Sequence, residues 1–253
     1  MVTFFLLREE ASVKVTTLGR LAISLALLAL PGAAAAQSGA QSIITEIAGK
    51  RIELFVPQGH CGLDRKNPSD QKAIELVERL TAGQNQLHLF SAECTQLSEW
   101  RAGGRPTLGE YAQVQSAVQF HSQDLSGREV EVIKSICTAT RQQGNEITAG
   151  VETDIKNRIE TGKEKIKIDN VAMLGALGED EMGCYVGLII KGVTDAGVPK
   201  SQLCVFANVV LNGRIMYIYR YAETVDQPTA DRLLLAVKAS ARTHVLANNR
   251  KKP

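Results

Sequence analysis

The sequence predicts an α+β fold in which an antiparallel sheet is covered by helices on both faces. Three observations predict it. An Asn-Gly pair at residues 212–213 joins two β-rich runs, and this is the strongest short signal for a hairpin because both turn residues need positive φ. The strands of the last third carry apolar residues on both faces, which favours a sheet covered on both sides. An amphipathic segment at residues 229–247 supplies a helix for one face.

The first half of the chain predicts an opening hairpin followed by a helix with a strong start signal. The hairpin runs show period-two alternation and end at Pro57. Asn67 can cap the helix, Pro68 suits its first position, and Asp70 favours the positive end of the helix dipole. Strands are predicted at residues 43–47, 51–56, 87–90 and 111–120, and helices at 68–82 and 94–101.

The second half predicts two helices, three strands and a closing helix. Helical spacing of apolar residues marks segments at 130–137 and 151–159, with the polar stretch 142–150 between them as a long surface loop. That loop does not separate two self-sufficient cores, so we expect one domain over residues 37–253. The strands are predicted at 185–190, 203–211 and 214–221, and the closing helix begins near Asp226.

Residues 1–36 are predicted to be a cleavable signal peptide. Residues 21–36 carry no charge, follow Arg20, and end in a run of alanines that fits a cleavage site. The apolar stretch before Pro31 is about ten residues, against the roughly twenty that span a bilayer, so a membrane anchor is disfavoured. We therefore expect a periplasmic or secreted protein that does not insert into the membrane after cleavage.

Composition excludes few function classes. The 253 residues are 44% hydrophobic and 22% charged, with a net charge of +2. Nucleic-acid binding normally needs a concentrated basic face, and the one basic run is the tail at residues 250–252, so no nucleic-acid partner is expected.

Five cysteines follow the predicted cleavage site, and an oxidising compartment favours disulfides between them. If the loop between their strands centres midway between them, Cys184 and Cys204 lie opposite each other within disulfide reach. Cys61 and Cys94 flank one helix and one strand and form the other predicted pair. Cys137 is then a buried thiol on a helix stripe. Spacing alone leaves this connectivity open.

The pattern of elements resembles the PsbP-like and Mog-like superfamily, whose members have an antiparallel sheet between helices. The resemblance rests on the turn at residues 55–59, the hairpin at 212–219 and the helix at 229–247. The middle of the chain is unmatched, and the two helices expected between residues 128 and 161 depart from the family pattern. The resemblance implies a binding or assembly factor, and it carries over no catalytic residue.

Several short patterns bear on chemistry, and a structural explanation is favoured for each. His60 beside Cys61 favours a loop or disulfide over a nucleophile, and a distributed zinc site from His60, His88 and a cysteine is disfavoured because disulfides compete for the thiols. The acidic run 179–181 fits a solvated turn. We predict no catalytic residue, no metal ligand and no cofactor-binding residue.

Two groups of residues that contain aromatic side chains have alternative explanations. Trp100 and Arg101 are residue types enriched at interfaces and are the predicted partner contact, although packing of Trp100 under a helix is the commoner outcome. Tyr217, Tyr219 and Tyr221 share one strand face. Such a row can form a ligand wall, and the favoured alternative is the core beneath the closing helix.

The sequence thus predicts an exported binding or assembly module without chemistry of its own, acting on an unknown protein or small ligand. The alternatives are a periplasmic enzyme with scattered site residues and an envelope protein that acts by interaction alone.

Overall fold

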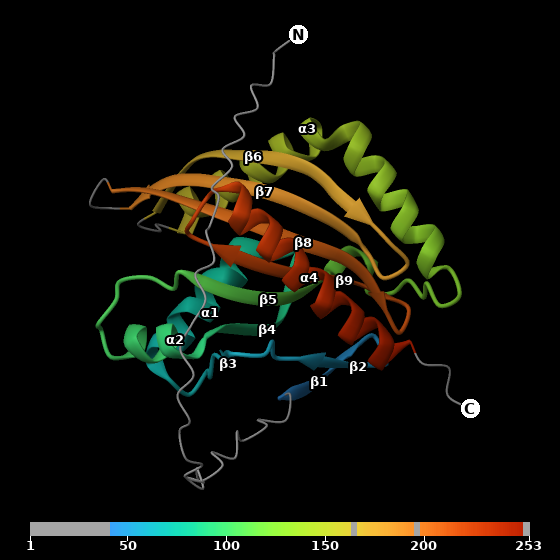
Figure 1. Cartoon of the computed structure of the whole chain (residues 1–253), viewed down its shortest axis with the longest axis horizontal. Coiled ribbons are helices and arrows are strands. Elements are labelled where there is room, and N and C mark those ends of the chain that lie inside the picture. The colour runs from blue at the N-terminus through green and yellow to red at the C-terminus, as the bar shows by residue number, and fades with distance from the viewer. Residues whose placement is uncertain (1–40, 163–165, 195–197, 250–253) are drawn as a thin grey trace, which may run out of the picture. The chain divides into compact units, whose positions relative to one another are not determined.

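The computed structural model describes residues 41–162, 166–194 and 198–249, and its centre is a seven-stranded antiparallel sheet (Figure 1). The strand order is β3-β4-β5-β9-β8-β7-β6, so the last four strands form a meander beside the earlier ones. Helices lie on both faces, which confirms the predicted α+β class. The strands are β3 (His60–Gly62), β4 (Asn85–Glu93), β5 (Glu110–Ala117), β6 (Ile166–Glu179), β7 (Cys184–Thr194), β8 (Pro199–Leu211) and β9 (Arg214–Ala222).

One face of the sheet is covered by α4 (Gln227–Asn248) and by a separate hairpin of β1 (Ser42–Ile47) and β2 (Lys50–Phe55). The side chain of Asp226 caps α4 by accepting a hydrogen bond from the Thr229 backbone N–H at 2.8 Å. The apolar stripe predicted for this helix is buried against the inner residues of β8 and β9. Leu233, Val237 and Ala241 form that stripe.

The free edge of β2 is closed by side chains of α4. The side-chain amide of Asn248 makes the two hydrogen bonds to Glu53 that a neighbouring strand would make. The Glu53 N–H donates to Asn248 Oδ1, and Asn248 Nδ2 donates to the Glu53 carbonyl, both at 2.8 Å. The Phe55 N–H donates to His244 Nε2 at 3.0 Å. The hairpin and the last helix therefore form one layer.

The opposite face is covered by α1 (Pro68–Thr81) and α3 (Glu129–Gly162), with the short α2 (Cys94–Arg101) and a 3-10 turn, η1 (Val118–Phe120), between strands. The predicted cap of α1 is confirmed, because the Asn67 side chain accepts from the backbone N–H of Ser69 and of Asp70. None of the helices in the described ranges combines the length and apolar character of a membrane span.

The predicted surface loop at residues 142–150 is wrong, because α3 is helical through it. The two expected helices are one span with a break in helical geometry at Gln143, where φ is −119° and ψ is 17°. The polar residues that suggested a loop lie on a helix. Gly144 follows the break, and a Cβ there would lie 2.9 Å from the Met173 sulfur of β6, so glycine permits the close approach of helix and sheet.

The sequence did not predict two of the strands, β3 and β6. β6 shows no period-two alternation because its pairing with β7 shifts register three times, and Gly175 and Gly178 adopt positive φ at two of these shifts. β3 has only three residues, fewer than a pattern needs. Both strands lie at sheet edges.

The disulfides agree with one predicted pair and contradict the other. The sulfurs of Cys61 and Cys94 are bonded at 2.00 Å, as predicted. The predicted Cys184–Cys204 pair is wrong, because Cys184 lies opposite Asn208 in the β7–β8 register and Cys204 lies opposite Leu188. Four residues of strand, roughly 13 Å, separate the two cysteines. Cys184 is bonded instead to Cys137 of α3, at 2.03 Å, and Cys204 is a buried free thiol.

Candidate functional site

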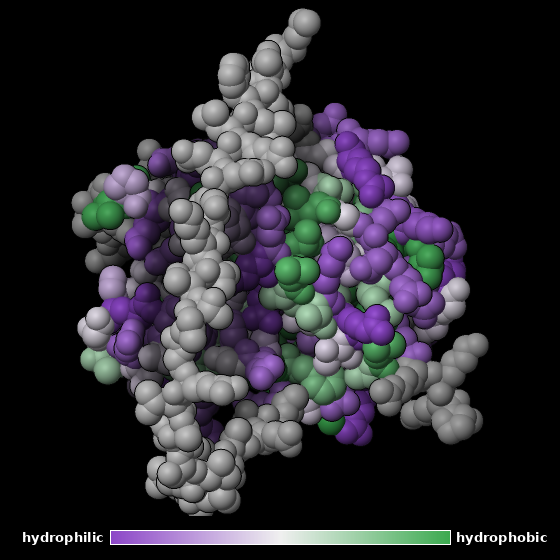
Figure 2. All heavy atoms as spheres, viewed as in Figure 1, coloured by the Kyte–Doolittle hydropathy of each residue, from purple (hydrophilic) through white to green (hydrophobic). Residues whose placement is uncertain are grey.

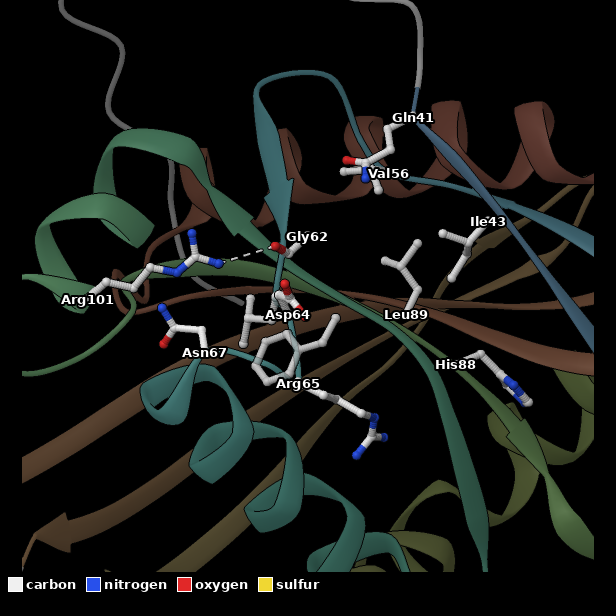
Figure 3. Close-up of a pocket in the computed structure, with 12 residues that line it drawn as sticks. Gln41, Ile43, Val56, Gly62, Asp64, Arg65, Asn67, His88, Leu89 and Arg101 are labelled. Carbon is white, nitrogen blue, oxygen red and sulfur yellow. Dashed lines mark hydrogen bonds between the residues drawn. The ribbon is translucent and has the colours of Figure 1, made fainter.

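Two cavities stand out in the described part of the chain, one on each side of strand β4. The first has a volume of about 680 Å³ and lies between β1, the segment after β3, and β4 (Figure 3). Arg101 and Asn67 lie at one end of it, and His88 and Ile43 at the other. It is open to solvent and largely polar.

The charge of Arg101 is fully engaged. Its guanidinium donates to the carboxylate of Asp70, from Nε to Oδ1 at 3.0 Å and from Nη2 to Oδ2 at 2.5 Å. Asp70 has no exposed surface and also accepts from the Asp64 N–H at 2.7 Å. The hydrogen bonds to Asp70 raise the pKa of Arg101. Arg101 therefore neutralises a buried carboxylate of α1 and is not an unpaired surface charge.

A chain of hydrogen bonds occupies the other end of the first cavity. His88 contacts the Thr45 hydroxyl through Nδ1 at 3.0 Å and the Ser116 hydroxyl through Nε2 at 2.7 Å, and Ser116 also contacts His121 Nε2 at 2.7 Å. Burial, and then the nearby His121, lower the pKa of His88 to about 4. The imidazole is thus neutral at pH 7, and it connects the β1–β2 hairpin to the main sheet.

The second cavity is partly open to solvent and mainly apolar, with a volume of about 460 Å³. It lies between α1 and the sheet face that carries the tyrosines of β9. One wall is aliphatic and comes from α1, α3 and strands β6 and β7, and the floor is aromatic and amide-bearing. Ala73, Leu76, Val77, Leu80, Ile159, Ile168 and Ile190 contribute to the wall, and Phe90, Trp100, Tyr111, Gln113, Gln115, Gln202 and Tyr221 line the remainder.

The prediction that the tyrosine row lies beneath the closing helix is wrong. Met216, Ile218 and Ala222 of β9 belong to the core that contains α4, so the alternating tyrosines point to the opposite face. Tyr221 stacks on Tyr111 of β5, with ring centroids 4.5 Å apart and planes inclined by 19°. Tyr221 and Tyr111 line the cavity, whereas Tyr217 and Tyr219 pack with Phe206.

The polar groups around the second cavity are held in unreactive states. The Tyr111 hydroxyl donates to Gln202 Oε1 at 2.8 Å, and burial raises the pKa of Tyr111 above its usual range. Burial likewise raises the pKa of the Cys204 thiol, whose residue lies opposite Tyr221 in the sheet. A thiolate or phenolate nucleophile is therefore disfavoured at neutral pH.

The ionic groups at the rim of this cavity neutralise each other. Lys200 Nζ lies 3.3 Å from Glu223 Oε1, and the Thr107 hydroxyl donates to the same oxygen at 2.6 Å. Burial alone would raise the pKa of Glu223, but these two contacts outweigh it and lower the pKa. The cavity thus offers hydrogen-bonding groups and no net charge.

The sequence-predicted site residues are only partly brought together. Trp100 lines the second cavity and Arg101 lines the first, so these neighbours face different spaces. Their contact with a partner stays a prediction. Within the described residues, no group of three or more His, Cys, Asp or Glu side chains is placed to hold a metal ion. The sequence did not predict the floor of this cavity. A visible signal was present, because Gln113 and Gln115 follow Tyr111 at period two and so share its face of β5.

Comparisons with known proteins give little beyond the fold. No family model matches the chain, and no curated protein matches it. One solved structure with a similar arrangement is the Ran-binding protein Mog1p of Saccharomyces cerevisiae, at 10% identity and a TM-score of 0.30, over 83% of this chain and 94% of that one. A TM-score this low carries no argument about the family of this chain. The function of the yeast protein does not transfer to this chain on that basis.

Proposed function

We propose that this protein is a non-catalytic binding module that holds a small, neutral, largely apolar molecule in the cavity beneath α1. The observation that carries the proposal is the cavity itself, at about 460 Å³ with an aliphatic wall and an aromatic floor. Pockets for small ligands span roughly 300–1,000 Å³ and combine apolar walls with a few fixed polar groups. The cavity has this make-up.

The polar groups of the floor define the ligand further. Gln113 and Gln115 are nearly fully buried, and Gln115 Nε2 donates to Gln113 Oε1 at 2.7 Å, so amide groups stand at fixed positions inside an apolar space. Such groups suit a ligand with a hydroxyl or carbonyl group. A charged ligand is disfavoured because Lys200 and Glu223 already pair at the rim.

The place of action is also part of this proposal. A signal peptide at residues 1–36 would deliver the remaining chain to the periplasm or the exterior, and two disulfides are compatible with an oxidising compartment. Membership of the PsbP-like and Mog-like superfamily belongs to the same proposal. Intact-mass measurement of protein purified from its host would show loss of residues 1–36 and of four thiol hydrogens.

An interaction surface on α4 is the second candidate. Leu235 is 70% exposed and Leu246 is 41% exposed, and their spacing of three helical turns places them on one face. Figure 2 shows hydrophobic surface in the region of this helix, bordered by hydrophilic residues. These two leucines are three helical turns apart, whereas the cavity has a continuous apolar lining, so the cavity is favoured.

Trp100 provides a direct test, because it is the only tryptophan and it lines the cavity. N-phenyl-1-naphthylamine, a neutral apolar fluorophore, is titrated into the purified protein. We expect its emission to rise and Trp100 emission to fall with the same apparent affinity. An Ala73→Phe variant fills the cavity from α1 and should weaken binding at least about tenfold, by removing the space for the probe.

The matched control is Ala149→Phe, which makes the same change at an exposed position of α3, away from the cavity and from α4. Equal probe affinity in both variants, or no quenching of Trp100, would overturn the proposal. Binding lost only in a Leu235→Ala variant would favour the α4 surface instead. If Ala73→Phe lowers the unfolding midpoint, Val77→Phe provides a second filling variant of the same wall.

A further inference from the structure

Three buried polar side-chain atoms of the described residues lack a hydrogen-bond partner, and all three come from one place under α4. They are Nδ1 of His60, Oγ of Ser91 and Nε of Arg220. Ser91 has no exposed surface, and Arg220 is 8% exposed. Buried polar groups are nearly always paired, so three unpaired atoms in one cluster call for an explanation.

The strand register shows why these atoms lie together. Gly62, Ser91, Ala112 and Arg220 are successive cross-strand neighbours on β3, β4, β5 and β9. Arg220 Nη1 nevertheless lies 3.0 Å from Nε2 of His60 on β3, so its side chain crosses β5 over the small Ala112. The Ser91 hydroxyl stands on β4 between the two residues. The Ser240 hydroxyl of α4 accepts from Nη2 at 3.1 Å and closes the cluster from above.

All three unpaired groups act as hydrogen-bond donors. A guanidinium has only donors, so Nε2 of His60 must accept the hydrogen bond from Arg220, and the imidazole proton then resides on Nδ1. A backbone contact with Ser91 raises the pKa of His60, but two larger effects oppose it. Burial, and then the Arg220 charge, lower the pKa of His60 to about 4, which keeps the ring neutral.

The cluster also carries one uncompensated positive charge. No carboxylate within the described ranges forms an ion pair with Arg220, and burial lowers its pKa to about 10. Glu110 raises that pKa from a distance, but its carboxylate is bonded to Arg232 at 2.6 Å. A buried guanidinium normally has an anionic partner because the loss of hydration is otherwise uncompensated.

We propose that Arg220 and Ser91 bind a small monovalent anion of chloride size beneath α4, with His60 holding the guanidinium in place. The anion accepts from the Arg220 Nε–H and from the Ser91 hydroxyl, and it neutralises the guanidinium. The Nδ1–H of His60 points away from Arg220, because Nε2 of the same ring faces Nη1, so His60 orients the guanidinium and does not contact the anion. Access is available from the first cavity, which is lined by Gly62 and Leu89, the neighbours of Ser91. A Cβ on Gly62 would meet no atom within 4 Å, so there is open space directly opposite Ser91. This site is separate from the apolar cavity and does not depend on it.

Bromide provides the first test, because it replaces chloride and scatters anomalously. In crystals of the protein soaked in sodium bromide, we expect an anomalous peak within hydrogen-bond distance of Arg220 and Ser91. In solution, we expect the urea midpoint to rise when sodium chloride replaces sodium gluconate at constant ionic strength. Ser91→Ala should raise the chloride concentration for half the effect by about tenfold, as expected for one charged hydrogen bond. Arg220→Gln should abolish the effect.

Ser91→Ala keeps the test valid if Arg220→Gln does not fold, since it removes one oxygen and adds no bulk. Ser135→Ala, at an exposed position of α3, is the matched control and should leave the chloride dependence unchanged. An ordered water only at the cluster, with no bromide peak, would overturn the proposal. So would equal midpoints in chloride and gluconate, or a Ser91→Ala variant with the wild-type chloride dependence.

Discussion

The Asp70–Arg101 pair shows how one distant contact determines the role of a residue. Asp70 is fully buried at the start of α1, and Arg101 at the end of α2 supplies two of its hydrogen bonds. The two residues are 31 positions apart, so neither local charge pattern indicates the other. Asp70 is recognisable in the sequence as a residue at a helix start, but its pairing with Arg101 is not.

We expect Arg101→Ala to destabilise the protein by about 2 kcal/mol, a value reduced from the usual cost of breaking a buried pair because Arg101 is partly exposed. The variant leaves the Asp70 carboxylate with the Asp64 N–H and without a counter-charge. Urea denaturation followed by circular dichroism gives the free energy of unfolding.

The double variant Asp70→Asn/Arg101→Ala should recover part of this loss, because the amide removes the buried charge. Arg101→Lys should fall between wild type and Arg101→Ala, since an ammonium cannot donate in the same two-point geometry. Equal stabilities for wild type and Arg101→Ala would contradict the assignment.

At the scale of elements, the disulfide between α3 and β7 is the main departure from the sequence-based connectivity. It joins residues 47 positions apart and holds the helix against the sheet. Cross-links of this span constrain the unfolded chain. The paired replacement Cys137→Ser/Cys184→Ser should therefore lower the free energy of unfolding by about 3 kcal/mol, measured by urea denaturation.

Peptide mapping of the unreduced protein provides the control for this assignment. We expect cross-linked peptides containing Cys137 with Cys184 and Cys61 with Cys94, and alkylation of Cys204 only after unfolding. A peptide joining Cys184 to Cys204 would contradict the β7–β8 register.

Elements with a clear local signal were predictable, and elements shaped by their neighbours were not. The Asn67 cap, the Asn212-Gly213 turn and the apolar stripe of α4 were each visible in a few adjacent residues. The pairing register of β7 and β8 has no such local signal, because it depends on the residue at which the connection between them turns. The connection centres two residues later than expected, so Cys184 and Cys204 are not opposite each other. In β6, the bulges change which residues face inward, so apolar and polar residues do not alternate at period two along the strand.

The candidate site could be predicted even less. The alternation of tyrosines on β9 was visible in the sequence. The sheet face that packs against α4, and the opposite face that packs against α1, are determined by the topology of the whole chain. A cavity is a gap between elements, and no single segment of sequence encodes it.

At the scale of the whole molecule, buried neutral histidines make stability dependent on pH. Burial lowers the pKa of His60 and of His88 to about 4, and it also lowers the pKa of His244. In the unfolded chain each titrates near 6.5. The unfolded state therefore binds more protons below that pH, so stability is complete above about pH 6.5 and is lost progressively toward pH 4.

We expect the free energy of unfolding to fall by roughly 4 kcal/mol between pH 7 and pH 5 from His60 and His88 together. Urea denaturation at several pH values measures this slope. A His88→Gln variant should show about half of the decrease, because the amide does not titrate. Carboxylates with lowered pKa, such as Glu93, act only below about pH 4.5 and do not account for this range. A flat profile from pH 7 to pH 5 would contradict the neutral buried state.

The closure of β2 by the last helix has a consequence for biogenesis. Glu53 and Asn248 are 195 positions apart, and Phe55 and His244 are 189 apart, so the edge of β2 stays open until α4 has been made. A nascent chain of this kind keeps its opening hairpin unprotected throughout synthesis, and such long-range closure is slow. The layer of β1, β2 and α4 above the sheet is therefore assembled after α4 has been synthesised.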